Sequence, residues 1–80
     1  MIARIKRAIL YLTPMGMSKE EIGRKLKEAR EKKRLTQAEV AKEAGLGTNY
    51  YAVIERGEVK TSPEKLEKIC KALGIRLVLG

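Results

Sequence analysis

The chain has 80 residues, 35% of them charged, with a formal net charge of +8. This length allows one small domain, and the basic excess favours nucleic acid or another anionic partner. Because there is no histidine and a single cysteine, Cys70, the sequence offers neither an intrachain disulfide nor a metal site, and we expect no cofactor.

Residues 1–17 form an N-terminal extension with three basic residues and no acid. Their apolar residues recur at helical spacing, but the continuous apolar run at 8–12 fits a strand equally well. That run is too short for a signal-peptide core or a membrane span, which indicates a cytoplasmic protein without a membrane partner. The basic residues are either an arm on DNA phosphates or a solvated surface: Arg4, Lys6 and Arg7. Because Met15 and Met17 precede the first clear helix cap, residues 1–16 are alternatively an extension from an early start.

Two capping boxes mark the beginning of the first two predicted helices. Ser18 is followed three residues later by Glu21, and Thr36 is followed in the same way by Glu39. The helices that they begin are expected at about residues 19–33 and 37–44. The first should expose a basic face, either solvated or in contact with DNA, that contains Lys25, Lys32 and Lys33.

Glycines and a proline delimit the next two predicted helices. Gly45 is expected to end the second helix, and Gly47 to cap a third helix over residues 48–56. A fourth helix should begin with Pro63 in its first turn and end at Gly74.

The C-terminal residues 75–80 are apolar and β-branched but too few for a helix, which predicts a strand over 75–79. A single strand leaves its backbone groups unpaired, so it needs a partner. That partner is either residues 5–12 of the same chain or the same strand of a second subunit. In the second case the dimer interface contains Ile75, Leu77 and Leu79. The domain limits that follow are 1–17, 18–74 and 75–80.

The stretch 36–57 has the layout of a helix-turn-helix: a short helix, a glycine turn, a second helix and a glycine stop. This motif presents its second helix to the DNA major groove. Small side chains at Ala41 and Gly45 should let the two helices approach. Larger apolar residues should fill the junction: Val40, Leu46, Tyr51 and Ile54.

The exposed face of the third helix is the candidate base-reading surface. Asparagine can bond adenine through two hydrogen bonds, and threonine and valine methyl groups suit the thymine methyl. The candidate base contacts are Thr48, Asn49, Tyr50 and Val53. The candidate phosphate contacts are Thr36, Gln37, Arg56 and Lys60. Glu58 lies among the latter in sequence and is expected to point away from a phosphate surface.

The sequence resembles the Cro/repressor-type helix-turn-helix family, also called the xenobiotic-response-element family, over about residues 20–75. The matching segments, in order, are Thr36-Gln37, Val40-Ala41, Ala44-Gly45-Leu46, Ile54-Glu55-Arg56-Gly57, Leu66-Glu67-Lys68-Ile69 and Ala72-Leu73-Gly74. The resemblance implies an all-α, compact four-helix bundle of the lambda-repressor-like type that binds operator DNA, usually as a dimer. It also implies an ion pair between Arg30 and Glu55, and a phosphate-binding and helix-positioning role for Gln37.

The chain departs from the family pattern at two places. Gly47 stands where many members have Ser or Thr, so a hydroxyl contact to phosphate is lost. The fifth helix that is common in the family is replaced by the predicted strand at 75–79, which looks like the short dimerising strand of some antitoxins.

These features predict a sequence-specific DNA-binding transcription regulator that inserts the helix at 48–56 into the major groove as a homodimer. It would be a repressor, either an antitoxin that regulates its own operon or a phage- or plasmid-type repressor. The expected partners are double-stranded DNA, a second copy and a toxin protein, with no small-molecule ligand. The alternative is a protein-interaction module, such as a coactivator, that does not read bases. An enzyme is disfavoured, since no catalytic constellation is present.

Overall fold

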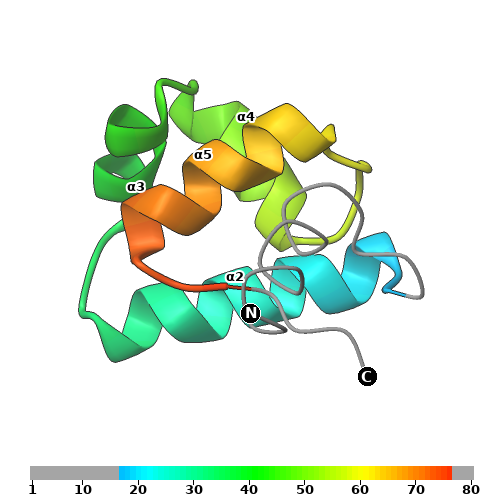
Figure 1. Cartoon of the computed structure of the whole chain (residues 1–80), viewed down its shortest axis with the longest axis horizontal. Coiled ribbons are helices and arrows are strands. Elements are labelled where there is room, and N and C mark those ends of the chain that lie inside the picture. Colours follow the sequence, from blue (N-terminus) through cyan, green and yellow to red (C-terminus); the bar gives the residue numbers. More distant parts are fainter. Residues whose placement is uncertain (1–16, 77–80) are drawn as a thin grey trace, which may run out of the picture.

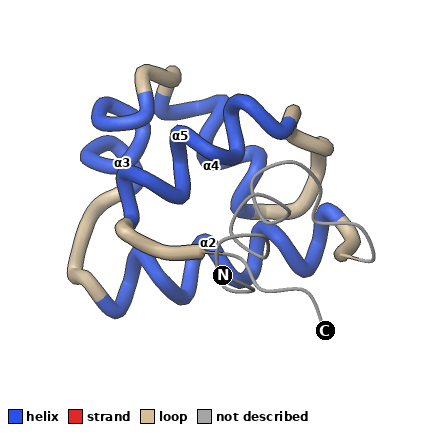
Figure 2. Tube along the Cα trace, in the orientation of Figure 1, coloured by secondary structure: helices blue, strands red, loops and turns tan. Residues whose placement is uncertain are grey.

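The computed structural model describes residues 17–76, and all regular structure in this part of the chain is helical (Figure 2). Four helices follow one another: α2 (Lys19–Lys32), α3 (Gln37–Ala44), α4 (Thr48–Glu55) and α5 (Pro63–Leu73) (Figure 1). The all-α prediction and the four helix positions are confirmed to within one residue at each end. Residues 1–16 of the predicted extension at 1–17, and residues 77–80, lie outside the described part. Residues 75 and 76 have no regular structure, so the strand stays a prediction.

The helices begin where the capping signals predicted. In the first box, Ser18 Oγ accepts from the Glu21 N–H at 3.0 Å, and Glu21 Oε1 accepts from the Ser18 N–H at 2.9 Å. Thr36 and Glu39 make the same two bonds at 3.0 and 2.7 Å. Each box satisfies backbone donors that the first helical turn leaves without an intrahelical acceptor.

The core lies where the helices meet: α2 packs on α4 and α5, and α3 packs on α4 and α5. All four helices contribute buried apolar side chains, and Tyr51 of α4 is the largest that is fully buried. Tyr51 is therefore a core residue, as expected. The buried apolar residues are Ile22, Leu26, Val40, Ala41, Ala44, Tyr51, Ile54, Leu66, Ile69, Cys70 and Leu73.

Gly23 marks a close approach of α2 to α4 that the sequence did not predict, whereas Gly45, which was expected with Ala41 to let α3 approach α4, makes no close contact. A Cβ atom built on Gly23 would lie 2.5 Å from the carbonyl oxygens of Ile54 and Glu55, whereas one on Gly45 would meet nothing within 4 Å. Gly45 is instead required by its backbone, because its φ of +72° ends α3 in the left-handed conformation that glycine adopts without strain. Gly23 thus sets the spacing between α2 and the C-terminal end of α4.

Replacing Gly23 by alanine tests this spacing, because two effects would change the free energy of unfolding in opposite directions. Helix propensity alone would stabilise the chain by about 1 kcal/mol. The steric conflict with α4 should outweigh it and lower the free energy of unfolding by about 1–3 kcal/mol. Urea unfolding of the parent and of Gly23→Ala measures the difference. A Gly23→Ala variant as stable as the parent would contradict the close contact.

Candidate nucleic-acid interface

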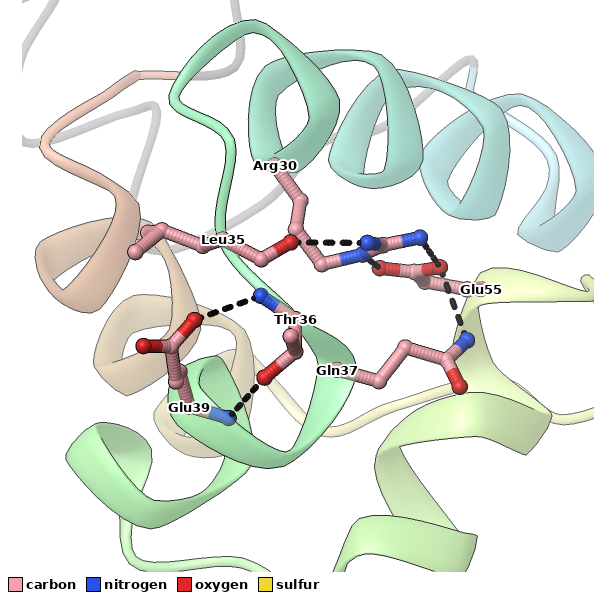
Figure 3. Close-up of polar contacts among 6 residues, drawn as sticks. All are labelled: Arg30, Leu35, Thr36, Gln37, Glu39 and Glu55. Atoms are coloured by element: carbon pink, nitrogen blue, oxygen red, sulfur yellow. Dashed lines mark hydrogen bonds and ion pairs between the residues drawn. The ribbon is translucent and has the colours of Figure 1, made fainter.

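Glu55, the last residue of α4, is the centre of a polar network that joins three helices (Figure 3). Arg30 of α2 donates to both of its carboxylate oxygens, from Nε to Oε2 at 2.7 Å and from Nη2 to Oε1 at 3.2 Å. Gln37, the first residue of α3, donates from Nε2 to Oε1 at 3.0 Å. The remaining Arg30 amino group donates to the Leu35 carbonyl at 2.9 Å. The ion pair implied by the family resemblance is therefore present.

The network keeps a buried carboxylate ionised. Glu55 is only 6% exposed, and burial by itself would raise the pKa of its carboxyl group. The hydrogen bonds from Arg30 and Gln37, together with the guanidinium charge, outweigh burial and hold that pKa below its usual range. Hydrogen bonding to Glu55 in turn raises the pKa of Arg30. Burial, followed by the nearby Glu55 carboxylate, raises the pKa of Tyr51 well above its ordinary value.

The candidate base-reading residues occupy two environments on α4. Thr48 and Asn49, in its first turn, are exposed, whereas Tyr50 and Val53 are half-buried. The Tyr50 ring packs against the core, and Lys65 Nζ lies 5.0 Å from its centroid. The N-terminal end of α4 therefore offers a threonine hydroxyl and an asparagine amide to a ligand.

The candidate phosphate contacts do not form one continuous patch of unpaired groups. The Thr36 hydroxyl already accepts from the Glu39 N–H, and one Gln37 N–H is used by Glu55. Arg56 Nε donates to Glu58 Oε2 at 2.8 Å. Glu58 thus pairs with the Arg56 guanidinium two residues before it, and the expectation that it points away from a phosphate surface stays a prediction. Lys60 is exposed.

Of the three candidate dimer residues, only Ile75 lies in the described part of the chain. Its side chain packs partly on the core of its own chain, and its N–H donates to the Cys70 carbonyl at 3.0 Å. Leu77 and Leu79 fall outside the described residues.

Two positions near the interface were not expected from the sequence. Gly23 sets the α2–α4 distance, and Lys65 lies over Tyr50. Neither belongs to a local motif, since each depends on which residue of another helix lies opposite. The residues that the structure describes contain no group of three or more potential metal ligands, and no helix among them is long and apolar enough to cross a membrane.

Comparison with known proteins agrees with this architecture. The family model described as Helix-turn-helix matches residues 26–79, so the chain belongs to the helix-turn-helix family, in its Cro/repressor (xenobiotic-response-element) group. This is a class of DNA-binding transcription regulators and not of enzymes.

Two individual proteins are similar to this chain. The immunity repressor protein of Bacillus phage phi105 is 38% identical over 56 residues, which are 70% of this chain and 39% of that protein. The chain thus spans less than half the length of this relative. The crystal structure of the restriction-modification controller protein C.AhdI from Aeromonas hydrophila matches with a TM-score of 0.69 and 33% identity, over 71% of this chain and 86% of that chain.

Because Glu55 is charged, the contribution of the network to the free energy of unfolding should depend on pH. Glu55→Gln leaves the Arg30 guanidinium without its carboxylate, so at pH 7 the free energy of unfolding should fall by about 3–5 kcal/mol. Because the folded-state pKa of Glu55 is lowered, its contribution is present above the unfolded pKa of about 4 and is lost as the pH falls through the folded value. Urea unfolding of parent and variant between pH 7 and pH 3 should therefore show their difference shrinking.

The exposed Arg56–Glu58 ion pair offers a matched control for the buried one. Glu58→Gln removes the carboxylate that binds Arg56, whose side chain is 56% exposed, and should change stability little at any pH. A Glu55→Gln cost that is negligible at pH 7, or equal at pH 7 and pH 3, would contradict the role given to the charge.

Proposed function

We propose that the protein is a sequence-specific repressor that inserts the N-terminal end of α4 into the major groove of operator DNA. The observation that carries the proposal is how α4 is held. Its last residue, Glu55, is hydrogen-bonded to α2 and α3, while Thr48 and Asn49 are exposed at its N-terminal end. An exposed asparagine on a rigidly held helix suits bidentate bonding to adenine. Val53, one turn further along α4, offers its methyl groups to thymine.

Gln37 links this reading helix to the DNA backbone in the proposal. A glutamine amide nitrogen has two N–H donors, and Glu55 uses one of them. The second is available for a phosphate at the N-terminus of α3, beside Thr36, where unpaired helix N–H groups also favour an anion. Lys60 and Arg56, the latter shared with Glu58, would approach the backbone beyond the other end of α4.

We propose that the protein acts as a homodimer on a partly palindromic operator, with two α4 helices about 34 Å apart, one turn of DNA. Its relatives are named as an immunity repressor and a restriction-modification controller, and the net charge of +8 suits a DNA partner. Either an antitoxin that represses its own operon together with a toxin partner, or a phage- or plasmid-type repressor, fits these features.

Base reading is tested in two steps: the parent chain selects its preferred sequence from random DNA, and the affinity of Asn49→Ala for that sequence is then measured. The parent chain should enrich a defined sequence, and the variant should lose about 1–3 kcal/mol of binding to it while binding random DNA as before. Glu43→Ala, an exposed position on α3, is the control and should not change the ratio of specific to random binding. If the parent enriches no sequence, the protein-interaction module that uses this fold without base reading becomes the better account.

Solution mass tests the dimer. At concentrations that saturate a palindromic operator, the full chain should have twice the 9.0 kDa mass of one chain, and a half-site duplex should bind far more weakly. A mass of 9.0 kDa with equal affinity for the full site and the half-site would show that one chain acts alone.

A further inference from the structure

Tyr50 and Lys65 form a contact between two helices that the base-reading scheme does not explain. Tyr50 is in the first turn of α4, directly after Asn49, and its ring is half-buried against the core. Lys65, in the first turn of α5, places its Nζ atom 5.0 Å from the ring centroid. This distance is typical of a cation–π interaction. A positive charge is therefore held beside the exposed end of the proposed reading helix.

The charge of Lys65 is not neutralised within the described part of the chain. Residues 17–76 contain four ion pairs, and Lys65 is in none of them. Other surface cations do have carboxylate partners, as Arg56 has Glu58 and Lys71 has Glu67. Lys65 is exposed, so its ammonium group keeps donors for a ligand while the ring limits where it can go.

Fold stability gives little reason for a lysine at this position. The backbone N–H groups at the beginning of α5 carry partial positive charge, which disfavours a cation in the first turn. A cation–π contact at an exposed site offsets this only modestly. An anionic ligand at the adjacent end of α4 would instead be attracted by the lysine.

We infer that Lys65 binds a backbone phosphate of the operator next to the bases contacted by Asn49, and that Tyr50 is the positioning residue that holds Lys65 there. The inference rests on the proposed function and adds α5 to the DNA interface. It also changes the role of Tyr50, whose ring supports a phosphate contact and does not itself select a base.

The test measures operator affinity of the full chain as a function of salt concentration. Each phosphate contact contributes about 0.9 to the slope of log affinity against log salt. Lys65→Gln should therefore reduce the slope by about 1 and weaken binding to operator and random DNA by the same factor. Lys68→Gln, an exposed lysine three residues further along α5, is the matched control and should leave the slope unchanged.

Variants of Tyr50 separate positioning from base contact. Tyr50→Leu should reproduce the reduced slope and have no further effect in the Lys65→Gln background, whereas Tyr50→Phe, which keeps the ring, should bind with the parent slope. The positioning role would be overturned if Tyr50→Leu changed the sequence preference and weakened binding as much in the Lys65→Gln background as in the parent. Thermal unfolding of each variant identifies any loss that comes from instability.

The outcomes distinguish the inference from the proposed function. A parent chain that enriches no sequence overturns both. A parent chain that selects an operator, while Lys65→Gln keeps the parent salt slope, overturns the inference alone and leaves the proposed repressor in place.

Discussion

The arrangement of this small domain depends on one buried carboxylate and the two side chains that bind it. Glu55 accepts hydrogen bonds from Arg30 and from Gln37, and Arg30 also binds the Leu35 carbonyl. These residues come from α2, the α2–α3 connection, the beginning of α3 and the end of α4. A buried charge is tolerated only when it is paired and hydrogen-bonded, so a packing of these helices that separated Glu55 from Arg30 would be costly. The network therefore favours one relative orientation of the three helices.

Packing and polar bonding act on the same end of α4. Gly23 lets α2 approach the carbonyls of Ile54 and Glu55, and this short distance lets the Arg30 side chain reach the carboxylate. The other end of α4 carries no comparable polar links in the described part of the chain, apart from Lys65 over the Tyr50 ring. Under the proposed function, a helix bonded to its neighbours at its C-terminal end and exposed at its N-terminal end is well placed to enter a groove.

Local signals in the sequence were sufficient for the helix limits but not for the contacts between helices. Ser18 and Thr36 could be assigned as caps because their partners are three residues away. Gly45 was correctly placed at a helix end, although its role is a left-handed backbone and not close packing. Gly23 and Lys65 could not be found in this way, because what matters at each is a residue on another helix. The Arg30–Glu55 pair, 25 residues apart, came from the family resemblance.

We propose that the Glu55 network presents α4 to DNA and extends to the DNA backbone through Gln37. A crystal structure of the chain bound to its selected operator tests it most directly. We expect Asn49 at a base edge in the major groove, with Gln37 Nε2 donating both to Glu55 and to a phosphate oxygen. A complex in which α4 lies away from the groove, or in which Gln37 has left Glu55 to bind DNA, would contradict it.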